Sequence, residues 1–492
     1  MARGNLSVSQ LTPNSKWQVS KASVINERER RIFMEVTELD KVKALLEDGQ
    51  DYVSLVVSES KQSLTPLAYF QGSDTHNIPE RWYFETPDRQ SAYAGFGSVK
   101  TLTGGDAQAD AIRLWGQKQR VVTIPIEHQP VAMPQLVGAL SFMPYAEEDE
   151  IWGELSRGYF FVPSIQVMQL ADKLINVINF SQEDKLSLDQ VAQERLALLH
   201  KLEQTAQHFV NQTVTVINER EVGVTDWLEL VERGVSTIKS HEGLDKVVVA
   251  RTLELETAEI LSIPTVVTQL REQQPNIYVF ALTYGTKGFV GATPERLLKA
   301  TDETFMTASV AGSTPRGVTQ EEDSRLGQQL LNDMKNRGEH RIVVDRIVAD
   351  LENLSGTPIQ LAKPSLLKNR DIQHLFLPIE ASRATDTSLL DGIIALHPTP
   401  ALGGEPKDKA LAFLAQYEPF QRGLYGAPIG WYGLGQDIGE FVVGIRSALI
   451  DGEKSVLYAG CGIVAESEPE LERQETRVKF QPMRRGIGGM EQ

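Results

Sequence analysis

Two glutamates and a lysine share one side of a helical pattern near the end of the chain. At about 100° per residue, Glu472, Glu475 and Lys479 fall on one stripe, and apolar Leu471 and Val478 flank it. The flanking residues indicate that this stripe faces the protein core. Buried charges are costly unless they pair or bind an ion, so the two carboxylates could hold a hard divalent cation. The alternative is a solvated helix in which Glu475 and Lys479 form an i,i+4 ion pair.

A third glutamate, Glu339, has a similar setting within a long helix predicted over residues 321–354. Apolar residues recur in this segment at helical spacing, and Glu339 falls on their side of the helix. A carboxylate paired with Arg337 or Arg341 would also explain its position. Together with the acidic stripe at the end of the chain, Glu339 favours a Mg²⁺ site. Mg²⁺ binds a few carboxylates and keeps positions for water and an anionic substrate.

Lys246 and Glu295 are candidates for acid–base chemistry. Lys246 opens a strand predicted over residues 246–255, and Glu295 directly follows another predicted strand. A lysine at a strand start usually faces solvent, but burial would lower its pKa and let the neutral amine act as a general base. Glu295 could be an ordinary glutamate at a helix start. In an apolar pocket its pKa would rise instead, and the protonated carboxyl could act as a general acid.

Three further features could bind an anion. The turn over residues 312–317 offers the Ser313 hydroxyl and free backbone N–H groups, although an ordinary Pro/Gly turn would look the same. Arg446 interrupts a strand that otherwise reads as buried, and its planar guanidinium suits a carboxylate. Gly460 and Gly462 would let a ligand approach the backbone closely.

Composition limits the partners of these residues. The chain has 492 residues and a net charge of −17, which argues against nucleic acid and anionic membrane surfaces. Its one cysteine, Cys461, excludes an intrachain disulfide and a multi-cysteine metal site. No apolar run approaches the roughly 18 residues of a membrane span, and the first residues lack a secretory signal. We therefore expect a soluble, cytoplasmic protein.

Strand-like and helical segments alternate irregularly along the chain. We expect helices over residues 186–218 and 224–239 and, among others, strands over residues 276–282, 288–291, 375–379 and 441–449. Hairpin-like strand pairs mixed with long helices predict an α+β, or mixed α/β, fold rather than a doubly wound parallel sheet.

Eight motifs occur together and in order: KVVVAR (246–251), GATPERLL (291–298), AGSTPRG (311–317), NRGEHRIVVD (336–345), LHPTPALGGEPK (396–407), GIRSALI (444–450), AGCGIV (459–464) and ERQETRVK (472–479). With them the chain resembles the chorismate-utilising enzymes, which include isochorismate synthases, salicylate synthases and anthranilate synthase large subunits. The resemblance covers residues 225–485 as the catalytic region, is weaker over the variable half at 21–224, and leaves residues 1–20 as a loose segment. It implies one large domain overall, with two packed sheets and helices outside.

Within that family, three features resemble isochorismate synthases. Lys246 stands where anthranilate synthases usually have glutamine, and it would activate water in place of ammonia. Ala311 stands where aminodeoxychorismate synthases commonly carry a nucleophilic lysine. The loop at residues 397–404 is also similar to the isochorismate synthase version.

The resemblance implies a role for each candidate residue. Lys246 would deprotonate a water that attacks C2 of chorismate, and Glu295 would protonate the departing C4 hydroxyl. Glu339 and Glu475 would hold Mg²⁺, with Glu472 acting through a water. The substrate would contact Ser313, His374, Ala401, Leu402, Arg446, Gly460, Gly462 and Lys479.

Two alternative functions stay open within the resemblance. A salicylate synthase would share Lys246 and Glu295 and would continue by eliminating pyruvate. An amidotransferase-dependent anthranilate or aminodeoxychorismate synthase subunit would need a glutaminase partner, and Lys246 argues against it. We expect isochorismate formation, a role in menaquinone or siderophore synthesis, and a monomer with no obligatory protein partner.

Overall fold

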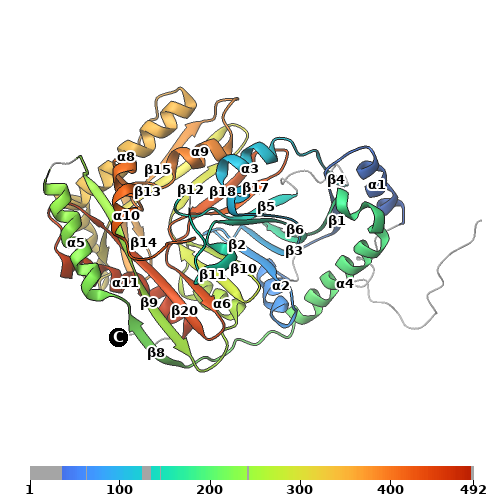
Figure 1. Cartoon of the computed structure of the whole chain (residues 1–492), viewed down its shortest axis with the longest axis horizontal. Helices are drawn as coiled ribbons and strands as arrows, with labels where there is room; N and C mark the ends of the chain where they lie inside the picture. The colour runs from blue at the N-terminus through green and yellow to red at the C-terminus, as the bar shows by residue number, and fades with distance from the viewer. Residues whose placement is uncertain (1–35, 62–63, 125–133, 145, 241–242, 489–492) are drawn as a thin grey trace, which may run out of the picture.

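The computed structural model describes residues 36–61, 64–124, 134–144, 146–240 and 243–488 (Figure 1). The predicted loose segment at residues 1–20 lies outside these ranges. Across the described part of the chain, no helix combines the length and apolarity needed to cross a membrane.

The strands form one hydrogen-bonded network that branches at the long strand β6 (Tyr159–Leu170). One edge of β6 pairs with β3 (Ser91–Thr103), and the other pairs with β5 (Gln135–Ala139) and then with β7 (Lys173–Ser181). The strand β7 continues to β1 (Tyr52–Lys61), which pairs in parallel with β4 (Val121–Ile124). Two layers leave this branch in different directions.

The first layer continues from β3 through β2 (Glu80–Glu85), β10 (Tyr278–Tyr284), β11 (Lys287–Thr293), β19 (Ser447–Asp451) and β20 (Lys454–Ile463) to β9 (Lys246–Thr257). The outer edge of β9 pairs with β16 (Gly404–Glu405) and β8 (Val216–Glu221). The second layer continues from β5 through β17 (Pro428–Gly433), β18 (Ile438–Val443), β12 (Arg296–Ala300), β13 (Thr304–Pro315) and β15 (Ile372–Ser382) to β14 (Ser365–Lys368).

The main apolar core joins the two layers. Phe280 and Phe289 of the first layer belong to the same buried cluster as Phe441 of the second layer. Because strand side chains alternate between faces, Val279 and Ala281 point the other way, into a separate cluster beneath the helices. The structure confirms the predicted mixed α/β fold, and its two layers are branches of one strand network.

Helices cover the outer surfaces of the strand network (Figure 1). Four contribute to the cluster outside the first layer: α2 (Pro66–Gly72), α4 (Leu188–Ala206), α6 (Ile263–Gln273) and α11 (Pro469–Ile487). The others with described bounds are α1 (Val36–Glu47), α3 (Ala109–Gly116), α5 (Val224–Lys239), α7 (Gln320–Asn332), α8 (Met334–Ser355), α9 (Leu389–Leu396) and α10 (Lys407–Tyr417). Of these, α8 packs on β13 and β15, and α9 packs on β12.

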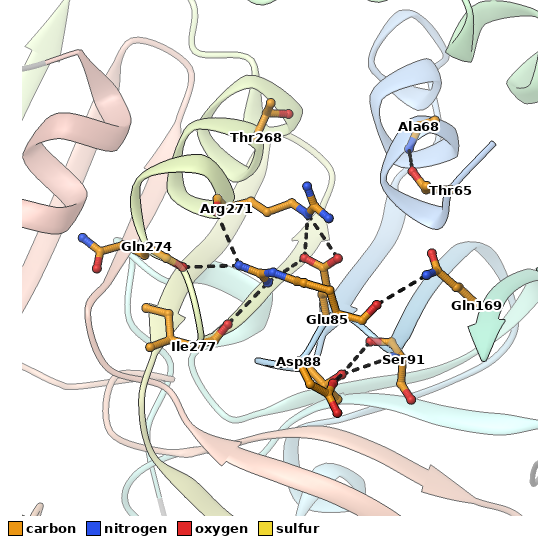
Figure 2. A network of polar contacts seen from close by, with 12 residues as sticks. Thr65, Ala68, Glu85, Asp88, Ser91, Gln169, Thr268, Arg271, Gln274 and Ile277 are labelled. Atoms are coloured by element: carbon orange, nitrogen blue, oxygen red, sulfur yellow. Dashed lines mark hydrogen bonds and ion pairs between the residues drawn. The ribbon is translucent and has the colours of Figure 1, made fainter. Parts of the chain in front are cut away.

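A buried polar network fixes α6 against β2 (Figure 2). The Glu85 carboxylate on β2 accepts hydrogen bonds from Arg89 at 2.6 Å and from Arg271 at 2.8 Å. The Arg89 guanidinium also donates to the carbonyls of Arg271, Gln274 and Ile277, where α6 ends. These donors satisfy carbonyls that a helix end leaves unpaired. A strand from the first half of the sequence is thereby tied to a helix from the second half.

Two predicted helices were wrong in extent. The helix expected over residues 321–354 is divided into α7 and α8 at Asp333, whose backbone is extended and whose carboxylate accepts the N–H of Asn336 as an N-cap. The helix expected over residues 186–218 ends at Ala206, and its last predicted residues belong to β8, which begins at Val216. The strand β8 pairs with the outer edge of β9, which would otherwise be unpaired there. This tertiary pairing overrides the local helical spacing.

Candidate active site

One cavity is lined by all of the predicted site residues except Lys246, whose Nζ is hydrogen-bonded to Glu339 of the lining. The lining comes from β9, β13, β15, β20, α8, α11 and the connections after β11, α9, α10 and β18. The predicted residues that line it are Glu295, Ser313, Glu339, His374, Ala401, Leu402, Arg446, Gly460, Gly462, Glu472, Glu475 and Lys479. Side chains from two distant helices and several strands therefore converge, as the acidic helix stripes predicted.

Lys246 is completely buried at the start of β9. Its Nζ donates a hydrogen bond to Glu339 Oε1 of α8 at 2.9 Å. Burial by itself would raise the pKa of the Glu339 carboxyl, but the Lys246 ammonium, together with Lys479 and Lys335, outweighs burial and holds that pKa below its usual value. Gly462 of β20 makes room for the pair, since a Cβ there would lie 2.8 Å from both Glu339 Oε1 and Lys246 Cε.

Glu295 follows β11 and is 5% exposed. Its backbone carbonyl accepts the N–H of Val443, which fixes the residue beside the second layer. Burial raises the pKa of the Glu295 carboxyl to about 8, even though Arg446, Lys246 and Lys479 act in the opposite direction. At neutral pH the carboxyl is therefore protonated and can donate a proton into the cavity.

The three glutamates predicted as metal ligands all reach the cavity, and each faces a lysine. Glu475 pairs with Lys479 at 2.6 Å on α11, and Glu472 lies 3.5 Å from Lys335 of α8. Burial, with Glu475 adding to it, raises the pKa of the Glu472 carboxyl. In the described part of the chain, no three His, Cys, Asp or Glu side chains are grouped closely enough to enclose a metal ion.

The donor chemistry of these glutamates nevertheless fits a hard cation. All three offer only carboxylate oxygens, which are the ligands that Mg²⁺ prefers. They come from two helices and face one cavity. Their lysine partners already show that positive charge is favoured at each carboxylate. Magnesium binding stays a prediction.

A cationic group occupies another wall of the cavity. Arg446 has a left-handed backbone with φ of 50°, which is costly for a residue with a side chain. Among the residues that the structure describes, no carboxylate lies within 4.0 Å of its guanidinium. Its Nη2 lies 3.4 Å from His374 Nε2, and His374 Nδ1 lies 2.8 Å from Ser313 Oγ. Nearby, Lys479 Nζ donates to the Gly460 carbonyl at 2.8 Å. This wall suits an anionic ligand.

A model of the chorismate binding enzyme family matches residues 40–488. The chain belongs to this family. Its curated relatives include isochorismate synthase MenF of Bacillus subtilis (strain 168), which is 36% identical over 454 residues, or 89% of this chain and 94% of the relative. The salicylate biosynthesis isochorismate synthase of Pseudomonas aeruginosa is 33% identical over 441 residues, or 87% of this chain and 90% of the relative.

The fold of this chorismate-binding enzyme also matches a solved structure. The structure of MenF, the menaquinone-specific isochorismate synthase from Escherichia coli, superposes with a TM-score of 0.72 at 24% identity, covering 92% of this chain and 99% of that one. At that identity the likeness establishes the fold. The family resemblance expected from the eight sequence motifs is confirmed.

The structure adds cavity residues that the sequence did not single out. Lys335, Asn336 and Tyr425 line the cavity of this chorismate-binding enzyme together with the predicted residues. Lys335 and Asn336 lie one turn before Glu339 on the same helix, so the i−3 and i−4 spacing could have suggested them. Nothing local marks Tyr425, because it reaches the cavity through the loop between α10 and β17.

Buried Arg422 fixes two walls of the cavity. Its guanidinium donates to the carbonyl of Leu402 at 2.9 Å and to that of Val248 at 2.6 Å. Glu418 holds the guanidinium through a 2.7 Å hydrogen bond and accepts the N–H of Ala250 at 2.8 Å. Arg422 and Glu418 supply hydrogen-bond partners to the part of the β9 edge that lies between β16 and β8. They thereby hold β9, the strand of Lys246, against the loop that carries Leu402.

Proposed function

We propose that this enzyme is an isochorismate synthase, which converts chorismate to isochorismate by adding water at C2 and releasing the C4 hydroxyl. One observation carries the proposal: Glu295, whose carboxyl is protonated at neutral pH, lines a cavity that also carries cations, and buried Lys246 is hydrogen-bonded to Glu339 of the same lining. The reaction needs a base for water and an acid for the leaving hydroxyl. Two relatives that match most of the chain both bear the name isochorismate synthase.

Binding would begin with the two carboxylates of chorismate. Among the described residues, the Arg446 guanidinium has no carboxylate partner, and Lys479 and the Ser313 hydroxyl lie in the same cavity. Charge-assisted hydrogen bonds of this kind are the stronger ones in proteins. Ala401 and Leu402 would contact the ring, and Gly460 and Gly462 would leave room for the substrate beside β20.

Proton transfer would then use the two buried groups. Glu295 would give its proton to the departing C4 hydroxyl, which its protonated state at neutral pH allows. Lys246 would take a proton from the water that attacks C2. Because Lys246 donates to Glu339 as an ammonium in the free protein, it must first pass a proton to an acceptor such as the Glu339 carboxylate before its amine can accept one from water.

We further propose that Glu339 and Glu475 hold Mg²⁺, with Glu472 acting through a water. When bound, the ion would supply positive charge against the clustered carboxylates and a Lewis acid beside the substrate carboxylate. The chain's own contribution is to present three carboxylates on two rigid helices at the cavity wall.

The Bacillus subtilis relative shares the name MenF with the Escherichia coli enzyme, whose structure is described as menaquinone-specific, and this supports a role in menaquinone synthesis. The name of the Pseudomonas aeruginosa relative supports a salicylate route as the alternative. We propose the menaquinone route, with the enzyme acting in the cytoplasm as a monomer. The proposed substrate is a small anion, which suits a cavity lined by cationic side chains.

A product assay tests the proposed activity. The protein is incubated with chorismate and Mg²⁺, and the products are separated by chromatography. Isochorismate without pyruvate is the expected result. Salicylate together with pyruvate would instead identify a salicylate synthase, and an aminated product formed only with ammonium would identify an amidotransferase-dependent synthase. Either of these results would overturn the proposal.

A further inference from the structure

A β-bulge in β13 sets the position of Ser313. The pairing of β13 with β15 shifts register between Ala311 and Ser313, so Gly312 is the extra residue, and Ser313 faces His374. Gly312 has a φ of +75°, and a Cβ there would lie 3.1 Å from the Cβ of Asn336. Bulges of this kind re-aim a side chain near functional sites. Here the bulge puts Ser313 at the cavity and brings its backbone against α8.

Asn336 holds this bulge from the first turn of α8. Its Oδ1 accepts the Ser313 N–H at 3.1 Å, and its Nδ2 donates to Asp333 Oδ1 at 2.7 Å. Asp333 Oδ1 also accepts the Asn336 N–H at 2.8 Å as the helix N-cap. The amide is therefore fixed at both ends, with its oxygen directed to Ser313.

The hydrogen-bond chain continues from Ser313 to Arg446 through His374. A guanidinium can only donate, so His374 Nε2, which lies 3.4 Å from Arg446 Nη2, must be the acceptor. Burial, with Arg446 and Lys479 adding to it, holds the pKa of His374 well below its usual value, so the ring is neutral. Its one proton is therefore on Nδ1, which lies 2.8 Å from Ser313 Oγ.

This arrangement fixes what the Ser313 hydroxyl can do. Because His374 Nδ1 carries a proton, the Ser313 hydroxyl cannot donate to it, and its own O–H proton is free to point elsewhere. Ser313 lines the cavity. The hydroxyl then joins Arg446 and Lys479 as a donor, which suits a carboxylate and disfavours a ligand that only donates.

We propose that Asn336 is a positioning residue, which holds the Ser313 bulge so that the chain from Arg446 through His374 to Ser313 presents a hydroxyl donor to a substrate carboxylate. The assignment of a carboxylate as the ligand rests on the proposed function. The direction of the hydrogen bonds from Arg446 through His374 to Ser313 does not. The side-chain amide of Asn336 is engaged by Ser313 and Asp333, so we assign its effect to the Ser313 backbone.

The first test reads the ring of His374 in the free protein. Nitrogen NMR of histidine-labelled protein, with His374→Gln for assignment, is expected to show Nδ1 protonated and Nε2 unprotonated at neutral pH. A proton on Nε2, or on both nitrogens, would overturn the proposal. This measurement needs no turnover, so it stands even if the enzyme makes no isochorismate.

The second test is a double-mutant cycle with Asn336→Leu and Ser313→Ala. Each is expected to raise KM for chorismate about 2- to 10-fold with less change in kcat, the range of one lost hydrogen bond. If Asn336 acts through Ser313, the double variant raises KM no further than Ser313→Ala alone. Independent, multiplying effects on KM would contradict the proposal.

A matched control distinguishes an effect specific to Asn336 from a general effect of replacing an asparagine in this part of the chain by leucine. Asn332 ends α7, is exposed, and donates its side-chain amide to the Gln328 carbonyl. Asn332→Leu makes the same substitution four residues earlier and is expected to leave KM and the His374 signals unchanged. Thermal unfolding of every variant shows whether a change in KM comes from a destabilised fold. An Asn336→Leu protein with native stability and unchanged KM would also refute the positioning role.

Discussion

Gly462 offers the sharpest steric test of the pair formed by Lys246 and Glu339. It lies on β20, and its φ is in the range open to any residue, so Gly462→Ala adds no backbone strain. The new Cβ would lie 2.8 Å from Glu339 Oε1, 2.8 Å from Lys246 Cε and 3.3 Å from Lys246 Nζ. Non-bonded contacts settle at about 3.5 Å or more. The two side chains must therefore move by roughly 0.7 Å relative to the strand.

The size of the effect follows from where this displacement acts. Lys246 is completely buried, so it has little space into which it can retreat. A misplacement of about 1 Å in reacting groups can cost about 100-fold in rate. We therefore expect Gly462→Ala to lower kcat/KM about 10- to 100-fold, which corresponds to about 1.4–2.7 kcal/mol of transition-state stabilisation.

The assay is the steady-state rate of isochorismate formation, with thermal unfolding measured alongside. Gly338→Ala is the matched control: Gly338 precedes Glu339 on α8, and nothing lies within 4 Å of its added Cβ. Alanine in a helix interior is favoured over glycine by roughly 0.5–1 kcal/mol, so this control should be active and at least as stable. A Gly462→Ala enzyme with wild-type kcat/KM would refute the reasoning.

The remaining predictions concern the acid and the metal ligands. Because the pKa of Glu295 in the free protein is about 8 and its protonated form is the active acid, kcat/KM should fall as pH rises through about 8. Glu295→Gln should abolish turnover without unfolding the protein, and a pH profile flat to pH 10, or an active Glu295→Gln enzyme, would remove Glu295 from this role. EDTA should abolish activity, and Glu475→Ala should reproduce that loss. Calorimetry should show weaker Mg²⁺ binding by this variant, and binding equal to that of the wild type would rule out Glu475 as a ligand.

The helical stripe at the chain's end was readable from sequence because its signal is local. Glu472, Glu475 and Lys479 follow helical spacing, and α11 presents them to the cavity as that spacing predicted. Glu339 was also predicted from the sequence, because it falls on the apolar side of its helix. The break at Asp333 was missed because neither proline nor glycine marks it, and its N-cap depends on the orientation of one carboxylate.

Long-range partners could not be read in the same way. The bond between Lys246 and Glu339 joins residues 93 positions apart, and only the packing of α8 on the strand network brings them together. The bulge at Gly312 depends on the register of a partner strand. Asn336 looked like an ordinary polar residue at a helix start until the Ser313 backbone was placed beside it.

Turnover in water enriched in ¹⁸O tests the central claim most directly, because Lys246 is held to activate a solvent water while Glu295 releases the original hydroxyl. Mass spectrometry of isochorismate from a single turnover should show one ¹⁸O atom, in the hydroxyl at C2. Isochorismate without the label would mean that the substrate's own oxygen migrated, and it would contradict the assignment of Lys246 and Glu295 as base and acid.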